Sequence, residues 1–442
     1  MNESSFSHRT LGDLIDTHVI QVTTGFPFGG HNSNGDGEVH IRPFNVGTDG
    51  AIHLEQIKSI PIDAASEKPR LQKGDIVFNN TNTKELAGKC ALWSSEERFV
   101  FSNHMTRIRP LKNSVDPAYL SFAIFHHWTT GKSEMLARSH VAQASIIGAR
   151  FREIEVPWPR VVEQKSIGQL LSQVQKARRT ETSQHELACK LKTATMRQLF
   201  TRGLRREAQK DTEFGAVPTS WKIDALDNVA IVQTGAAKGR KLADTDTIEV
   251  PYLRVANVQD GHLDLREMKT IQIRRRELNR FRLEDGDVVL TEGGDFDKLG
   301  RGFIWRSELE VCVHQNHVFA VRANRHLLLP EFLAYLAQSA YGKAYFLRVA
   351  HKTTNLACIN STKLKAFPVL LPAHNEQREI VAILDAIDRK IVLHQKKQTV
   401  LEALFHSLLH KLMTGEISVD DLDLSALTPE EPQSKTEAEL QS

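Results

Sequence analysis

The chain has 442 residues, of which 40% are hydrophobic and 25% charged, so it is long enough for two or three folded domains and is not expected to be disordered throughout. No apolar stretch approaches the ~20 residues needed to cross a bilayer, and the N-terminus does not read as a signal peptide, which argues against membrane and secreted proteins. The four cysteines form no C-x-x-C pair, which disfavours a zinc cluster or disulfide framework and suits a reducing cytoplasm.

The net charge of +3 is unevenly distributed along the chain. Residues 420–442 hold seven acids and one lysine, a net charge of −6, which leaves +9 on the remainder. Basic residues cluster at 197–210 and 274–282. A basic body is compatible with polyanion binding, and the acidic tail at 419–442 is expected to be disordered.

The sequence contains an internal repeat. The stretch "VPWPRVVEQKSIGQLL" at 156–171 is matched by "VLLPAHNEQREIVAIL" at 369–384, and "IRPFNVGTDGAIHLEQIKSI" at 41–60 by "YLRVANVQDGHLDLREMKTI" at 252–271. "GDIVF" and "GDVVL", and the two Asn-His pairs at 103–104 and 316–317, follow at similar offsets. A period this long exceeds that of solenoid repeats and indicates a duplicated domain.

Each copy consists of a mixed α/β region with short β-branched runs and glycine turns, followed by one long helix. We expect a mixed α/β fold in which two α/β domains are separated by two long antiparallel coiled-coil helices with pseudo-two-fold symmetry. The expected boundaries are 1–160 for the first domain, 161–210 for the first helix, 211–373 for the second domain, 374–418 for the second helix and 419–442 for the tail.

The second helix has a coiled-coil seam. Apolar residues recur at steps of 3 and 4 from Ile380 to Leu412, with His394 and Gln398 at the polar centre. The first helix has a less regular seam that is also polar in its middle, with Arg178 and Lys192 among its members. Because amphipathic helices need a buried face, the two are expected to pack on each other, and a partner's helix is a hypothesis for covering the polar centre.

Catalytic motifs are scarce. The sequence has no P-loop, no G-x-G-x-x-G after a strand and no H-E-x-x-H. His406 and His410 stand one helical turn apart without a third ligand, so no metal site is expected. Glu267 and Lys269 have the E-x-K spacing of some nucleases, with acids at 260 and 264 upstream, which leaves a metal-dependent nuclease open as an alternative.

Taken together, these features resemble the specificity subunit of type I restriction–modification systems. The resemblance covers nearly the whole chain and is carried by the two strand–proline–Glu-Gln–long-helix segments and by the link at 199–235, "LFTRGLRREAQKDTEFGAVPTSWKIDALDNVAIVQTG". It implies a non-catalytic subunit whose two target recognition domains each read half of a split DNA sequence. It also implies two methyltransferase subunits that use S-adenosylmethionine, and two motor–nuclease subunits that use ATP and Mg.

Candidate DNA-contacting residues are polar side chains in glycine-flanked loops, because base edges are read by donors and acceptors. They are His31, Asn32, Asn80, Asn82, Lys84 and Lys89 in the first copy, and Lys238, Arg240, Lys241, Lys298, Arg301, Lys352, Thr353 and Asn355 in the second. The two Asn-His pairs are instead expected to make structural hydrogen bonds. The candidate residues of the spacer helices and their partner surface are Glu163, Gln164, Leu171, Glu376, Gln377, Ile387, Ile391, Leu401 and Phe405.

A second alternative is a coiled-coil adaptor whose basic loops bind nucleic acid without sequence preference. Selection of bound DNA separates it from a specificity subunit, since an adaptor enriches no motif.

Overall fold

The computed structural model describes residues 6–111, 114–139, 141, 143–239, 246–294, 299–352 and 357–422. The acidic tail expected to be disordered lies outside the described residues from 423 onward. The chain divides into two compact units. Unit 1 comprises Met1–Thr182 and Lys396–Ser442, and unit 2 is the continuous segment Ser183–Gln395. The division therefore falls within both predicted helices rather than at their ends.

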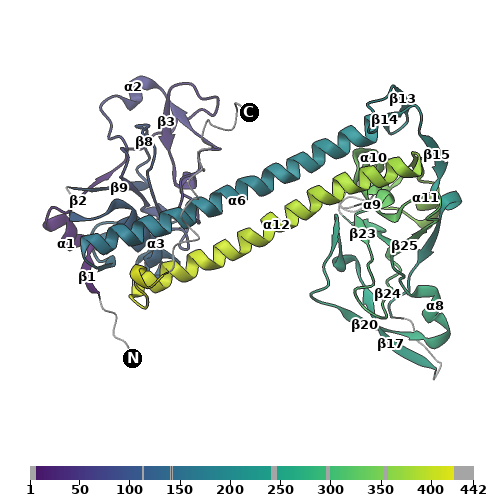
Figure 1. Ribbon diagram of the computed structural model, residues 1–442. Helices are drawn as coiled ribbons and strands as arrows, with labels where there is room; N and C mark the ends of the chain where they lie inside the picture. The colour runs from purple at the N-terminus through teal and green to yellow at the C-terminus, as the bar shows by residue number, and fades with distance from the viewer. Residues whose placement is uncertain are drawn as a thin grey trace, which may run out of the picture. The chain divides into compact units, whose positions relative to one another are not determined.

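Unit 1 is built on a four-stranded antiparallel sheet with the order β2 (Ile20–Thr24), β9 (Met105–Pro110), β5 (Ile76–Asn79) and β7 (Cys90–Leu92). Helix α3 (Pro117–Thr129) packs against β7 (Figure 1). Two three-stranded sheets follow: β4 (Ser59–Ile60), β3 (Glu38–Ile41) and β8 (Val100–Phe101); and β10 (Arg138–Ser139), β11 (Ala144–Ser145) and β6 (Thr81–Asn82). Strand β1 (Ser7–Thr10) pairs with β12 (Glu155–Trp158), and the short helices are α1 (Leu11–Asp16), α2 (Ile62–Ala65), α4 (Lys132–Leu136) and α5 (Ala149–Arg152).

Unit 2 repeats this plan. Its four-stranded sheet has the order β16 (Ala230–Thr234), β25 (Val318–Ala323), β21 (Val288–Thr291) and β23 (Gly302–Ile304). The smaller sheets are β20 (Lys269–Arg274), β17 (Thr247–Leu253) and β24 (Val313–His314); β22 (Gly293–Gly294), β27 (Ala357–Cys358) and β26 (His351–Lys352); and the pair β15 (Lys222–Ala225) and β28 (Pro368–Leu371). Unit 2 also contains two hairpins, β13 (Gln209–Thr212)–β14 (Gly215–Pro218) and β18 (Val258–Gln259)–β19 (His262–Leu263). Its shorter helices are α7 (Leu226–Val229), α8 (Leu278–Phe281), α9 (Pro330–Gln338), α10 (Ala340–Val349) and α11 (Ser361–Lys365).

The duplication extends to individual hydrogen bonds. Buried Asp75 accepts two bonds from Arg109, at 2.6 and 2.7 Å, and buried Asp287 accepts two from Arg322, both at 2.8 Å. Such bidentate pairs compensate the cost of burying a carboxylate. Gly25 and Gly235 are matched as well. A Cβ at either position would fall only 2.2 or 2.0 Å from a backbone carbonyl oxygen of the adjacent segment, so both positions require glycine.

The two long helices are α6 (Val161–Arg202) and α12 (His374–Thr414). In unit 1, the start of α6 and the end of α12 share one core that contains Ile167, Leu171 and Leu409. In unit 2, the end of α6 and the start of α12 share another, which contains Phe200 and Leu384. The helices are therefore antiparallel within each unit, and the predicted mixed α/β fold is confirmed. None of the described helices combines the length and apolar character needed to cross a membrane.

Charged residues at the polar centre of the helix pair are paired within the chain. In unit 1, Arg178 bonds Glu402, with its Nε 2.9 Å from the carboxylate, and its guanidinium lies 4.3 Å from the ring centroid of Phe405. In unit 2, Lys192 lies 2.7 Å from Asp388. Nη1 of Arg178 is buried without a hydrogen-bond partner among the described residues, so the hypothesis that a partner's helix stabilises this centre stays a prediction.

The repeated Glu-Gln pair explains how each long helix is attached to its unit. Gln164 is fully buried, donates to the carbonyl of Pro159 at 2.9 Å and accepts from the backbone amide of Asp116 at 3.1 Å. Gln377, also fully buried, donates to Pro372 and Leu327 and accepts from the amide of Leu329 at 2.9 Å. Asp116 and Leu329 are the N-cap residues of α3 and α9. Each glutamine thus ties the first turn of a long helix to the start of the helix beneath it.

We expect Gln377→Glu to destabilise unit 2 by about 3 kcal/mol, because the second carboxylate oxygen would face two backbone carbonyls with no donor. Urea unfolding followed by circular dichroism measures the change. Glu376→Gln on the same turn is the control, since an amide oxygen can still accept the 3.2 Å bond from the Leu204 amide. A loss below ~1 kcal/mol for Gln377→Glu would contradict the role given to this side chain.

Candidate nucleic-acid interface

Polar side chains converge on Arg42 in unit 1. Arg42 follows strand β3 and lines two neighbouring cavities, of about 530 and 370 Å³. His104, from the turn between β8 and β9, also lines both. The larger cavity adds Asn82, Lys89 and Gln143, and the smaller adds Phe28 and Asn103 among others. The two cavities form one recessed surface with hydrogen-bond donors and acceptors from four segments of the chain, at 42, 81–89, 102–104 and 143.

Two histidines, His31 and His40, form a chain of contacts that begins at Arg42. The Arg42 guanidinium lies 2.8 Å from Nε2 of His31, which in turn lies 2.9 Å from Nδ1 of the buried His40. Burial lowers the pKa of His40 to about 4, and burial together with Arg42 lowers the pKa of His31. Both rings are therefore neutral at pH 7, and Arg42 carries the positive charge of this cluster.

Lys89 is the second cation of this surface. It precedes β7 and only 6% of its area is exposed. Within the described part of the chain, no acceptor lies within hydrogen-bonding distance of its ammonium group, and Asp49 acts on it only through space. Burial lowers the pKa of this lysine. Lys89 therefore lines the larger cavity with a charge that is poorly solvated.

The other predicted residues of unit 1 divide into contact and structural groups. Asn82 lines the larger cavity, as expected for a contact residue, and exposed Lys84 lies 3.7 Å from Glu134 at the surface. Asn80 was a wrong choice, because it is 3% exposed and donates to Thr106 at 3.0 Å inside the unit.

His31 and Asn32 have internal bonds instead of free polar groups. The ring of His31 is held between Arg42 and His40, and Asn32 donates its amide to the carbonyl of Asp36 at 2.9 Å. Both residues stabilise the loop beside the cavities, so the structure does not present them as base readers.

Unit 2 has the same framework with different side chains. Arg254 matches Arg42 and donates to the carbonyl of Glu267 at 2.7 Å. Arg301 matches Lys89, because each precedes the strand paired with the "GD-V" strand, and it bonds the side chain of Gln259 at 3.1 Å. His317 lies 2.5 Å from the carboxylate of Glu292, the residue that matches Asn80. The polar groups of unit 2 are thus paired with one another.

The structural bonds expected of the Asn-His pairs occur in both copies, since Asn103 Oδ1 accepts from the Ser102 hydroxyl at 3.4 Å, but the two histidine rings differ. His317 makes the structural bond described above, whereas the His104 ring faces the two cavities without a bonding partner among the described residues. Of the remaining predictions in unit 2, Lys238 is exposed. Arg240, Lys241, Lys298, Thr353 and Asn355 lie outside the described residues, and of Lys352 only the backbone, in β26, is described.

Three residues of the surface were not predicted: Arg42, His104 and Gln143. The internal repeat could have identified Arg42, since "IRPFN" and "LRVAN" place an arginine at the same position in both copies. An arginine that follows the matched strand in both copies of a basic chain is a candidate for contact with the same ligand, a polyanion.

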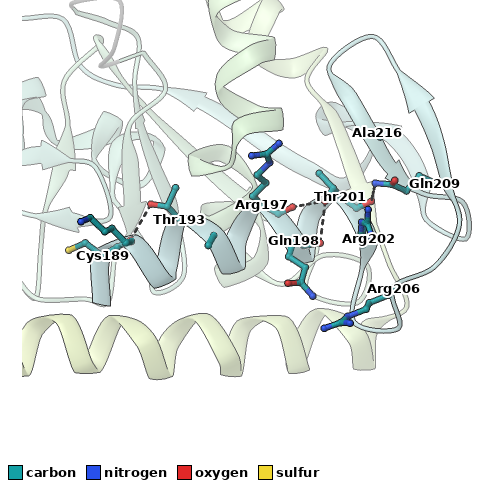
Figure 2. A pocket seen from close by; sticks show the side chains of 11 residues that line it. Cys189, Thr193, Arg197, Gln198, Thr201, Arg202, Arg206, Gln209 and Ala216 are labelled. Atoms are coloured by element: carbon teal, nitrogen blue, oxygen red, sulfur yellow. Dashed lines mark hydrogen bonds between the residues drawn. The ribbon is translucent and has the colours of Figure 1, made fainter. Parts of the chain in front are cut away.

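A basic groove runs along the end of α6 in unit 2. It measures about 1120 Å³ and is lined by residues of α6 and of the β13–β14 hairpin, including Lys190, Arg197, Arg202 and Arg206 (Figure 2). No carboxylate pairs with these four cations within the described residues. Gln209 links the hairpin to α6 through a 2.8 Å bond to the carbonyl of Thr201. The groove is therefore an open, cationic surface beside the helix.

The predicted partner surface on the helices needs correction. Leu171, Phe405 and both buried glutamines are inside the unit cores and are not available to a partner. Ile387, Ile391, Leu401, Glu163 and Glu376 are half-buried. The large apolar side chains that α12 exposes are Ile383, Val392, Leu393, Val400 and Leu404, with exposed fractions of 38–65%.

The acids of the nuclease alternative do not converge on one point. Asp264 is bound by Arg266 at 2.7 Å and Asp260 by Lys343 at 2.8 Å. Glu267 lies 3.7 Å from Lys269. Within the residues that the structure describes, no three side chains of the metal-ligating types gather in one place.

His406 and His410, which have metal-like spacing, contact separate groups. His406 lies 2.9 Å from Glu402, and His410 lies 3.2 Å from His126 and 3.6 Å from Glu416. Their separate contacts give no support to a shared site.

Comparison with known proteins places these features in a family. The family model described as the type I restriction–modification DNA specificity domain matches residues 38–188 and 218–403, one stretch in each copy of the repeat. The StySPI specificity subunit from Salmonella potsdam is 24% identical over 392 residues, covering 86% of this chain and 82% of that protein. The MjaVIII specificity subunit from Methanocaldococcus jannaschii is 25% identical over 335 residues, covering 73% and 76%.

A solved structure has a similar fold. The S subunit of a type I restriction–modification system from M. genitalium superposes with a TM-score of 0.59 at 16% sequence identity, covering 93% of this chain and 97% of that one.

We expect unit 1 to lose stability as the pH falls from 6.5 toward 4. Between these values the unfolded chain protonates His40 and the folded chain does not, so folding weakens by at most about 3 kcal/mol. His40→Tyr, which places there the residue found at matched position 252, removes the share of His40 and so reduces the dependence, while His126 and His127, whose pKa values burial also lowers to about 4, keep theirs. Urea midpoints measured from pH 4 to 8 test it, with His8→Tyr at an exposed site as control. Equal slopes for wild type and His40→Tyr would contradict it.

Proposed function

Because the chain belongs to the family of type I restriction–modification DNA specificity subunits, we propose that it reads a DNA target in two parts, one with each unit. The observation that carries this proposal is the repeated framework, which has the same strand order in both units and places a recessed polar surface at Arg42 in unit 1 and the matched Arg254 in unit 2. Two copies with the same backbone and different polar side chains suit a target whose halves differ.

Sequence reading requires donors and acceptors that reach base edges. Unit 1 presents Arg42, Asn82, Lys89, His104 and Gln143 from a recessed surface, which suits direct contact with bases. In unit 2, Arg301 bonds the side chain of Gln259 and Glu292 bonds His317, so the charges of this unit are arranged differently. These differences support distinct half-targets.

Specificity subunits bind DNA and assemble with other subunits of type I systems. For this chain we propose a non-catalytic role, with two methyltransferase subunits that supply S-adenosylmethionine chemistry and motor–nuclease subunits that use ATP and Mg. The support is the family membership together with the absence of phosphate-loop and dinucleotide motifs from the sequence. The exposed apolar side chains of α12 are the candidate contacts for such subunits.

The basic groove of unit 2 is proposed to contact the DNA backbone. Arg197 and Arg202 are exposed on α6 and have no carboxylate partner among the described residues. Phosphate contacts of this kind add affinity that is independent of sequence and falls with salt.

The central experiment selects duplexes from a random DNA pool with the full chain and the subunits that co-purify with it. A motif in two parts with a fixed gap is the expected result. Recovery of bound DNA with no enriched sequence would overturn the proposal in favour of an adaptor with non-specific binding. Metal-dependent cleavage by the pure chain, lost in Lys269→Ala, would instead favour the nuclease.

We expect the double variant Arg197→Ala/Arg202→Ala to weaken binding of all duplexes and to lower the slope of log K against log salt by between one and two. The selected motif should be unchanged. Lys165→Ala/Lys176→Ala, which removes two exposed cations from the other half of α6, is the matched control. An unchanged salt slope in the first variant would contradict the phosphate contact.

A further inference from the structure

The side chain of Lys89 is buried at a cost that the free protein does not offset. Its backbone is fixed, because its carbonyl accepts from the amide of Asn79 at 2.9 Å. The residue is 6% exposed and lines the 530 Å³ cavity, and its ammonium group has no hydrogen-bond acceptor among the described residues. Partial loss of water around an ammonium group is unfavourable unless an acceptor replaces that water. A bound acceptor would remove this cost, so the position is suited to a ligand.

The surroundings of Lys89 limit the chemistry of that ligand. Arg42 supplies a second cation, and Asn82 and Gln143 supply amides on the same cavity wall. Phe44, 46% exposed, adds an apolar ring at this cavity. Phosphates line the outside of a duplex and are within reach of exposed cations, whereas a recessed ammonium requires a group that projects into the cavity. A flat base edge with adjacent acceptors satisfies both the charge and the shape.

Guanine presents such an edge in the major groove, where O6 and N7 are neighbouring acceptors bound by Lys or Arg. We propose that Lys89, with Arg42 beside it, reads a guanine in the half-target bound by unit 1. The proposal rests on the proposed function, since it assumes that this surface faces DNA bases.

Unit 2 lacks this arrangement at the matched position. Arg301 replaces Lys89 and already bonds Gln259, and Ala256 replaces Phe44. Glu292 places a carboxylate where unit 1 has Asn80, and it holds His317 at 2.5 Å. The guanine contact is therefore confined to the half-target of unit 1, which gives the proposal an internal reference.

The test compares DNA selection by the wild-type complex and by a complex with Lys89→Met, a variant of similar length without charge. The expected result is loss of one guanine preference in one half of the motif, with the other half unchanged and affinity for the original target reduced roughly tenfold or more. The thermal midpoint of Lys89→Met should equal or exceed that of the wild type, because a buried unpaired charge has been removed. Lys84→Met, in the same loop but exposed, should leave the selected motif unchanged, because an exposed lysine contributes only sequence-independent affinity.

A second measurement leaves the protein intact. Each guanine of the selected target is replaced in turn by 7-deazaguanine, which lacks the N7 acceptor. One replacement should weaken binding by the wild type and have no further effect on Lys89→Met.

The outcomes separate the two proposals. A wild-type complex that selects no motif overturns the proposed function and this inference with it. A clear wild-type motif that Lys89→Met retains in full, or a uniform loss of affinity for all duplexes, overturns the guanine contact alone. A clear wild-type motif in which no 7-deazaguanine replacement weakens binding also overturns it.

Discussion

The buried glutamine in the first turn of each long helix is the contact on which the arrangement of each unit depends. Gln164 and Gln377 satisfy backbone groups on either side of the junction, including the amide of the residue that caps the adjacent helix. An amide side chain can do this because it donates and accepts at once, and glutamate cannot. The direction of α6 relative to α3, and of α12 relative to α9, is thereby fixed within each unit.

Beyond these junctions the units keep matched framework contacts and differ in the side chains around Arg42 and Arg254. The Asp75–Arg109 and Asp287–Arg322 pairs hold the same strands, and Trp93 and Trp305 fill the same core positions. Around them, Lys89 becomes Arg301 and Asn80 becomes Glu292. A framework stabilised by bonds that do not involve the reading surface can accept such changes at little cost to folding, which allows one fold to present two different chemical surfaces.

The sequence was sufficient to predict the repeat, the mixed fold and the two long helices, because hydrophobic periodicity and matched offsets can be recognised without knowing which residues meet in space. It also singled out the Glu-Gln pair at the start of each long helix, but not the backbone groups that the glutamine binds. Reading-surface residues were harder to predict, since Asn80 and Asn82 look alike in the chain and differ only in which way the backbone turns them. Burial of Lys89 depends on strands distant in sequence, and Arg42 is one arginine among many.

The division of the units along the chain has a consequence for biosynthesis. Unit 2 is one continuous segment, so all its core residues have been synthesised before residues 396–422 are made. The core of unit 1 includes Phe405, Leu409 and Leu412, which are separated from their neighbours in α3 and α6 by more than two hundred residues of chain. The first residues to be synthesised are therefore among the last to reach their final packing, and a nascent chain exposes the apolar face of unit 1 throughout translation of unit 2.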